Sequence, residues 1–209
     1  MRTKWVAERM AQEALRRGIP TSIYRPGRVA GHSRTGAVGP QDAFWHLVRA
    51  CIELGAAPDA ATGAWSGLGE NLVPVDHVVD ALLHLAFHEE PDGRAFSLIN
   101  PRPTHIHVVL DRARALGYRI RPVPYQQWTA LLAERAVGTP HGADSSVPTV
   151  AVLNSGMSES GGSVSPEFAR AHTERGLTGS GIECPPMDAA LLDRYFRHFV
   201  DSGFLPAVG

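Results

Sequence analysis

Four side chains in this 209-residue sequence suggest chemistry by their type and position. His105 and His107 lie two residues apart, a spacing that suits a metal ion on a strand. No third ligand accompanies them, so two solvated loop histidines are the simpler interpretation. Asp76 follows an apolar run and offers an isolated carboxylate, but its place near the start of a helix favours helix capping. Lys4 is either an ordinary surface lysine or part of a catalytic pair.

Composition narrows the class of protein. The chain is 44% hydrophobic and 20% charged, which is typical of a globular domain with a core. Its 20 basic and 21 acidic side chains give a formal net charge of −1, which argues against nucleic acid or an anionic membrane as partner. Cys51 and Cys184 show no CxxC spacing and are expected to be free thiols. No apolar run approaches the roughly 18 residues that cross a bilayer, and no secretory signal is visible, so we expect a cytoplasmic protein.

Hydrophobic periodicity and turn residues predict the elements that hold these side chains. We expect helices over residues 5–17, 41–55, 107–116, 125–135 and 187–202, and strands near 23–24, up to 75, over 95–100 and over 119–123. A further helix contains Asp76 and is expected to bury Val79, Leu82, Leu83 and Leu85. Residues 138–148 and 156–165 are rich in Gly, Ser and Thr and are predicted to be loops, either unconstrained or forming a lid or a docking surface. Trp128 and Tyr125 either line a substrate channel or belong to the core, which is the commoner place for aromatics at helical spacing.

No single catalytic motif is present, since the sequence has no G-x-G-x-x-G, no P-loop and no G-x-S-x-G. The order of several blocks is more informative: TKWVAE, RPGRVAGHSRTGA (25–37), LGAAPD (54–59), VPVDHV (73–78), FSLIN and the tail CPPMDAALLDRYFRHFVDSGFLP. In this order they resemble the second half of an extended short-chain dehydrogenase/reductase. The resemblance is closest to the thioester reductase domains of nonribosomal peptide synthetases and carboxylic acid reductases, and it runs from Lys4 to Pro206.

The resemblance implies a Tyr-x-x-x-Lys catalytic motif in which Lys4 is the lysine and Thr3 the residue beside it. The tyrosine of this motif falls one position before Met1, and the glycine-rich phosphate turn also lies outside the 209 residues. In the family the tyrosine hydroxyl protonates the oxygen of the reacting carbonyl. The lysine lowers the pKa of that hydroxyl and hydrogen-bonds the ribose of the nicotinamide cofactor, which is expected to be NADPH.

Two further sets of residues follow from the resemblance. Pro26, Gly27 and Val29 are expected to bind the nicotinamide end of the cofactor through their backbone, although a tight strand exit would also explain them. Arg28, His32 and Ser33 are expected to line the cleft that the substrate thioester enters. No metal site is predicted.

The implied fold is α/β, the C-terminal part of a Rossmann-like extended short-chain dehydrogenase/reductase with a mainly helical substrate-binding lobe and without the N-terminal cofactor half. Residues 1–31 and 71–100 are the expected Rossmann-like elements, and 32–70 and 101–209 the substrate-binding lobe. The incomplete sheet exposes an edge, through which a homodimer could form.

Two functions are compatible with these features. In the first, the chain is the C-terminal part of an NAD(P)H-dependent thioester reductase that converts a carrier-protein-bound acyl or peptidyl thioester to an aldehyde or alcohol, and it is not catalytic in isolation. In the second, it is a stand-alone, non-catalytic binding module derived from such a reductase, which contacts a carrier protein or a partner enzyme.

Overall fold

The computed structural model describes residues 2–39, 42–59, 69–139, 144–154 and 169–208. The chain divides into two compact units, each described here by itself. Unit 1 comprises Met1–Ser33, Asn71–Arg102 and Glu167–Pro186, and unit 2 comprises Arg34–Glu70, Pro103–Pro166 and Met187–Gly209. The segment that ends at Pro186, which the sequence assigned to the substrate lobe, therefore groups with the elements of unit 1.

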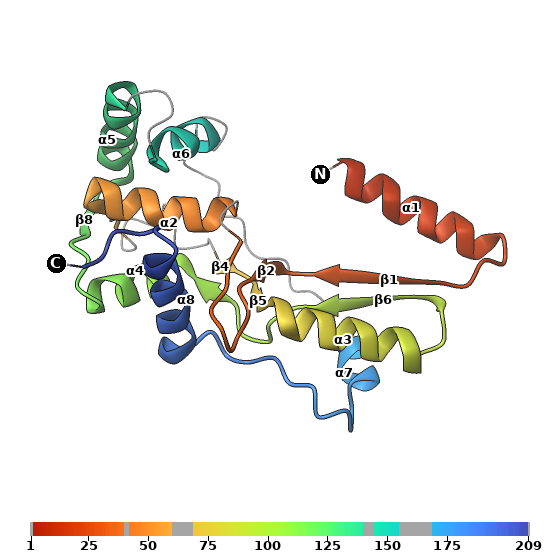
Figure 1. Ribbon diagram of the computed structural model, residues 1–209. Helices are drawn as coiled ribbons and strands as arrows, with labels where there is room; N and C mark the ends of the chain where they lie inside the picture. The colour runs from red at the N-terminus through yellow and green to blue at the C-terminus, as the bar shows by residue number, and fades with distance from the viewer. Residues whose placement is uncertain (1, 40–41, 60–68, 140–143, 155–168, 209) are drawn as a thin grey trace. The chain divides into compact units, whose positions relative to one another are not determined.

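Unit 1 is built on short parallel strands flanked by helices. Its elements are α1 (Arg2–Arg16), β1 (Thr21–Pro26), β2 (Arg28–Ala30), β5 (Leu72–Pro74), α3 (Val75–His88), β6 (Asp92–Leu98) and α7 (Ala171–Gly176). Strand β1 pairs with β6 and β2 with β5, in both cases in parallel. Helices α1 and α3 lie on opposite sides of the β1–β6 pair (Figure 1). Helices on both faces of a parallel sheet are the arrangement expected of an α/β fold.

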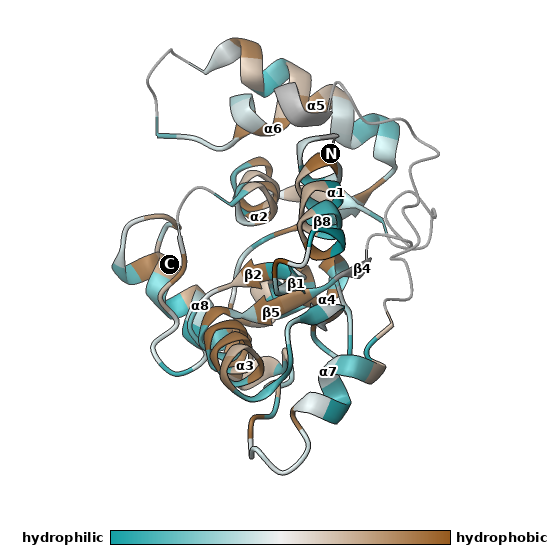
Figure 2. Cartoon of the chain, turned by 90° about the vertical axis from the view of Figure 1, so that its right-hand side faces the viewer, coloured by the Kyte–Doolittle hydropathy of each residue, from teal (hydrophilic) through white to brown (hydrophobic). Residues whose placement is uncertain are grey.

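The β1–β6 pair is held by register and by ring packing. Tyr24 lies opposite Phe96, and their rings stack with centroids 5.6 Å apart. Apolar side chains of β5, α3 and β6 form the core beneath these strands: Val73, Val78, Ala81, Leu85, Phe96 and Leu98. Figure 2 shows the hydrophobic colouring of β2, β5 and α3 that corresponds to this core. A buried, near-continuous apolar run is what a parallel strand covered on both faces requires.

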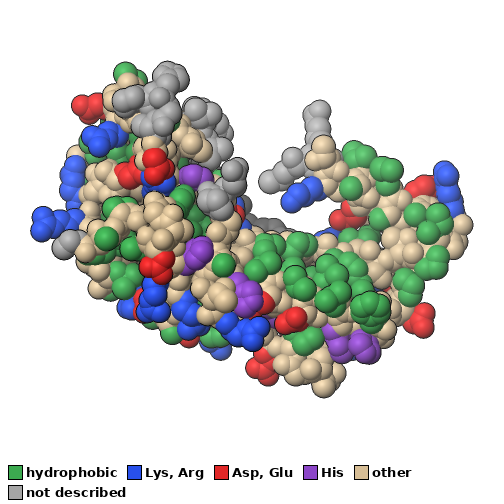
Figure 3. Space-filling model, viewed as in Figure 1, with side chains coloured by type: hydrophobic (Ala, Val, Ile, Leu, Met, Phe, Trp, Pro, Cys, Tyr) green, Lys and Arg blue, Asp and Glu red, His purple; other side chains and the backbone are tan. Residues whose placement is uncertain are grey.

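Helix α3 departs from the burial pattern expected of it. Leu85 is fully buried as predicted, but Val79 and Leu83 are 47% and 48% exposed, so the prediction that they are buried was wrong. With Phe87, which is 81% exposed, they recur every four residues and form one apolar stripe on the helix surface. Figure 3 shows hydrophobic side chains gathered over α3. The helix therefore has two apolar faces, of which only one is covered in unit 1.

Unit 2 is mainly helical. Its elements are α2 (Ala43–Leu54), β3 (Ala56–Pro58), β4 (Gly69–Glu70), β7 (Thr104–His105), α4 (Ile106–Ala115), β8 (Arg121–Val123), α5 (Tyr125–Gly138), α6 (Val147–Asn154) and α8 (Ala189–Asp201). Strand β3 pairs with β8 in parallel, and β4 pairs with β7 in an antiparallel manner. Within the part of the chain that the structure describes, no helix is both long and apolar enough to span a membrane.

The core of unit 2 is aromatic. Trp45 of α2 lies 5.7 Å from Tyr195 and 4.9 Å from Phe199 of α8, measured between ring centroids. The carboxylate of Asp42 caps α2, as predicted, by accepting a hydrogen bond from the Phe44 amide at 2.7 Å. Trp128 is fully buried, so the core interpretation of this side chain is confirmed. The loop predicted over 156–165 lies outside the described residues.

Candidate functional site

The site is built where β1 ends. Pro26 pairs with Leu98 at the carboxyl end of the β1–β6 pair, and the Gly27 amide donates to the Leu98 carbonyl at 2.9 Å. One residue later the chain changes partner, because the Arg28 amide donates to the Asn71 carbonyl at 2.8 Å and opens the β2–β5 pair. In open α/β sheets, ligands bind in the crevice outside the carboxyl ends of the strands. The change of partner lies at this edge.

Gly27 is required by the packing of this crossing. A Cβ atom on Gly27 would lie 2.6 Å from Asn71 Oδ1 and 2.7 Å from the Asn71 carbonyl oxygen, so no side chain fits. Asn71 in turn is bound to Asn100: its Nδ2 donates to the Asn100 carbonyl at 2.9 Å, and its Oδ1 accepts from the Asn100 amide at 2.8 Å. Both asparagines are buried. Sequence reasoning missed this pair, although a polar residue at the end of the apolar run over 95–100 was a signal for Asn100.

Two contacts of α1 point its N-terminal turn, which carries Lys4, toward the same edge. Near the C-terminal end of the helix, Leu15 packs against Gly93 beside the start of β1, where Thr21 pairs with Asp92. At Glu8 the helix reaches the other end of the strand, since Arg25 Nε donates to Glu8 Oε2 at 3.1 Å and Arg25 Nη2 bonds Glu8 Oε1. The helix thus runs back along β1, and its N-terminal turn, which carries Lys4, lies toward the carboxyl end of the strand (Figure 1).

The side chains around this edge are accessible. Thr3, Lys4 and Pro26 are exposed, and Val29 is 40% exposed. Among the described residues, no ion pair or hydrogen bond involves the Lys4 ammonium group. An exposed cation at the carboxyl edge of a parallel pair has the donors that suit ribose hydroxyls. These groups suit the ribose and nicotinamide end of a dinucleotide, whereas the sequence contains no G-x-G-x-x-G motif for its phosphates.

Of the expected substrate residues, Arg28 begins β2, whereas His32 and Ser33 follow the strand, and Ser33 is held by hydrogen bonds to Asp76. The Ser33 amide donates to Asp76 Oδ1 at 2.8 Å, and the Ser33 hydroxyl donates to Asp76 Oδ2 at 2.5 Å. Ser33 is 8% exposed, and His32 Nδ1 lies 3.9 Å from Asp76 Oδ2. Arg28 is half-buried. Asp76 therefore fastens the segment after β2 to the first turn of α3, which differs from the simple helix capping that the sequence favoured.

The environment of Asp76 keeps its carboxylate charged. Burial acts to raise its pKa, but the hydrogen bonds from the Ser33 hydroxyl and amide and the charge of His32 outweigh burial, so the pKa lies below its ordinary value of 3.8. The charged form is the one that accepts both hydrogen bonds from Ser33. The carboxylate therefore holds Ser33 and is not poised to donate a proton at neutral pH.

The other candidates from the sequence do not assemble into sites. The rings of His105 and His107 stack with centroids 5.2 Å apart, but the described residues contain no group of three or more His, Cys, Asp or Glu side chains suited to a metal. Cys51 and Cys184 are free thiols, as predicted. Burial raises the pKa of each thiol to about 12, which leaves both protonated at neutral pH.

A family model, a curated relative and a solved structure are each similar to this chain. Residues 1–82 match the family model described as male sterility protein, an NAD-binding family. The chain is 33% identical over 210 residues to the isonitrile lipopeptide synthase of Streptomyces coeruleorubidus, covering 98% of this chain and 14% of that protein. Among solved structures, the terminal R domain from the myxalamid PKS-NRPS biosynthetic pathway has a TM-score of 0.84 and 33% identity, covering 99% of this chain and 50% of that one.

A second solved structure resembles the chain in fold alone. A thiolation-reductase di-domain from an archaeal non-ribosomal peptide synthetase has a TM-score of 0.75 at 19% identity, covering 96% of this chain and 40% of that one. The chain thus spans at most half the length of these relatives.

Proposed function

The chain belongs to the extended short-chain dehydrogenases/reductases and corresponds to the C-terminal portion of a thioester reductase domain, and from this we propose its function. We propose that it supplies the lysine, the nicotinamide-side loop and the substrate lobe of a cytoplasmic, NADPH-dependent reductase. The substrate is an acyl or peptidyl thioester on the phosphopantetheine arm of a carrier protein. The observation that supports this proposal is the direction of α1, whose N-terminal turn, with Lys4, lies toward the end of β1 at which Pro26 and Gly27 leave the strand.

The chemistry is a reduction of a carbonyl carbon. NADPH, when bound, supplies the hydride. The thioester takes up that hydride and one proton, the carbon–sulfur bond breaks, and the products are an aldehyde and the free thiol of the arm; a second round would give the alcohol. Lys4 is proposed to bind ribose hydroxyls and to place a positive charge beside the proton donor, which lowers the pKa of that donor.

The loop after β1 has a positioning role in this proposal. The Gly27 amide is already donated to the Leu98 carbonyl, so Gly27 itself offers no N–H to a ligand. It serves instead as the point where the chain passes close to Asn71 and turns into β2. Val29, which is 40% exposed on β2, is the residue of this set that would present its surface to the nicotinamide.

Similarity to nonribosomal peptide synthetase domains supports a carrier protein as partner, since one fold relative is a thiolation-reductase di-domain. Arg28 and His32 are proposed to contact the arm or the acyl group as it enters. Ser33 contributes by holding the loop through Asp76. A homodimer through the exposed sheet edge stays a prediction.

The proposal is tested by joining this chain to the nucleotide-binding half of the myxalamid-pathway R domain. We expect the joined protein to oxidise NADPH in the presence of an acyl-pantetheine thioester, and the 209-residue chain alone not to. In the joined protein, Lys4→Ala should lower turnover about 100-fold or more, as expected for loss of a group that tunes a proton donor.

Arg16→Ala is the matched control, since Arg16 is a cation in the last turn of the same helix and pairs only with Glu13 among the residues described. It should leave turnover unchanged. A joined protein that turns over equally well without the Lys4 ammonium would refute the assignment of Lys4.

A further inference from the structure

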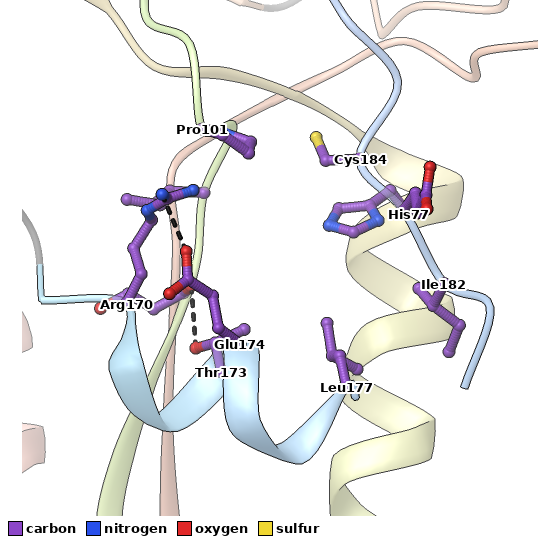
Figure 4. Close-up of a pocket in the computed structure, with 11 residues that line it drawn as sticks. His77, Pro101, Arg170, Thr173, Glu174, Leu177, Ile182 and Cys184 are labelled. Carbon is purple, nitrogen blue, oxygen red and sulfur yellow. Dashed lines mark hydrogen bonds and ion pairs between the residues drawn. The ribbon is translucent and has the colours of Figure 1, made fainter. Parts of the chain in front are cut away.

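Unit 1 contains a cavity that the proposed reaction does not use. Its volume is about 380 Å³, within the range of small-molecule sites. It lies between α3, the end of β6, α7 and the segment that follows α7 (Figure 4). Its aliphatic wall is formed by Ile99, Pro101, Leu177 and Ile182. A cavity of this size with several aliphatic side chains in its lining suits a ligand that has hydrocarbon to bury.

One wall of the cavity carries a donor and an acceptor side by side. Nη2 of Arg170, the N-cap residue of α7, lies 2.8 Å from Oε1 of Glu174, one turn further along the helix. Figure 4 shows both side chains at the edge of the cavity, opposite His77. The guanidinium has five N–H donors and the carboxylate has several lone pairs, so the pair can bind a further donor and a further acceptor without separating.

His77 contributes a neutral group. Burial lowers its pKa below 6.5, against the opposing effects of Asp76, Asp80 and the Glu183 backbone. In addition, His77 Nδ1 is enclosed and has no hydrogen-bond partner among the described residues, so a second ring proton would have no acceptor. The imidazole is therefore uncharged at neutral pH.

The charges around the cavity disfavour an anion. Arg170 is opposed by the carboxylates of Glu174 and Glu183. Asp76 is close enough to Cys184 to raise the pKa of that thiol. A carboxylate or phosphate would therefore meet a net negative environment, while an ammonium ion would face Arg170 and lose its hydration against the aliphatic wall.

We propose that this cavity binds an uncharged secondary amide flanked by aliphatic groups. The carbonyl of one amide accepts from the Arg170 guanidinium, and the N–H of a neighbouring amide in the same ligand donates to the Glu174 carboxylate, because a trans amide points its own C=O and N–H in opposite directions. The aliphatic flanks of the ligand pack on Leu177 and Ile182. Amide chemistry of this kind occurs in a peptidyl chain and in a pantetheine arm. Naming either as the natural occupant rests on the proposed function, whereas the amide site itself does not.

The test is a binding titration of the purified 209-residue chain, followed through the backbone amide resonances of Thr173, Leu177 and Ile182. The two probes are N-acetylalanine N-methylamide, which represents a peptide, and pantetheine. We expect saturable shifts at these residues, with a dissociation constant on the order of 1 mM for ligands of this size. The tighter of the two probes identifies the source.

Arg170→Leu should weaken binding of the preferred probe about tenfold or more, a loss equivalent to about 1.4 kcal/mol. The fold should survive, because a partly exposed i,i+4 ion pair contributes little to stability. Arg175→Leu is the matched control, since Arg175 is an exposed cation on α7 outside the cavity, and it should leave binding unchanged.

Three outcomes would overturn the proposal. The first is the absence of saturable shifts with either amide. The second is binding that Arg170→Leu leaves intact. The third is binding of butanoate or butylammonium at least as tight as that of the amides, which would assign the cavity to an ion. None of these readouts depends on NADPH turnover, so they separate failure of the cavity site from failure of the proposed reaction.

Discussion

Asn71→Ala is expected to lower the free energy of unfolding by about 2–5 kcal/mol, because it leaves two buried backbone groups without partners. The Asn71 side chain binds both the amide and the carbonyl of Asn100, at 2.8 and 2.9 Å. Asn100 is only 2% exposed, so water cannot replace the lost carboxamide. Chemical denaturation followed by far-UV circular dichroism measures the change.

The size of the effect reflects how many segments meet at this pair. Asn100 Nδ2 donates to the Leu72 carbonyl at 3.2 Å and to the Pro185 carbonyl at 3.3 Å, so the network joins β5, the end of β6 and the segment before α8.

The control variant is Gln127→Ala, which removes an exposed side-chain amide and should lower the free energy of unfolding by less than about 0.5 kcal/mol. Equal stability losses for the two variants would show that the buried network contributes no more to stability than an exposed side-chain amide does.

Gly27→Ala is expected to destabilise the protein by more than about 2 kcal/mol, through overpacking at a place that cannot relax. The new methyl group would lie 2.6 Å from Asn71 Oδ1 and 2.7 Å from the Asn71 carbonyl oxygen. The side-chain oxygen could move only by breaking its bond to the Asn100 amide, and the carbonyl oxygen is held by the Arg28 amide. Either movement breaks a hydrogen bond at the point where the chain leaves β1.

Gly39→Ala provides the control for this prediction, because nothing lies within 4 Å of a Cβ atom at Gly39 and its backbone is not in the left-handed region. That variant should be neutral or slightly stabilising, since alanine reduces the entropy of the unfolded chain. If thermal unfolding shifts equally in both variants, the close approach of Gly27 to Asn71 is not a constraint.

Local patterns in the sequence predicted most elements of both units. Periodic apolar residues located α2, α4, α5 and α8, and the apolar run over 95–100 located β6, because these signals depend on neighbouring residues alone. The six-residue helix α7 was missed, since it is shorter than two turns and shows no period. Val79 and Leu83 were misjudged because α3 has apolar residues on two faces, and periodicity cannot tell which face is covered.

The candidate site was harder to predict because it depends on contacts between distant residues. The order of sequence blocks pointed to Lys4 and to the loop after β1, but the ion pair between Glu8 and Arg25 that orients α1 along β1 joins residues 17 apart. Asp76 holds Ser33 across 43 positions. No local pattern specifies such contacts, and they determine which residues share the carboxyl edge of the strands.

The central claim is that this chain belongs to an enzyme that delivers hydride to a thioester carbonyl carbon. The most direct test gives the joined protein an acyl-pantetheine thioester together with NADPH deuterated at the transferable position, and measures the mass of the acyl product. The account predicts an aldehyde with one deuterium on its carbonyl carbon, or an alcohol with two on the same carbon, and free pantetheine. A carboxylic acid without deuterium, the product of simple hydrolysis, would contradict it.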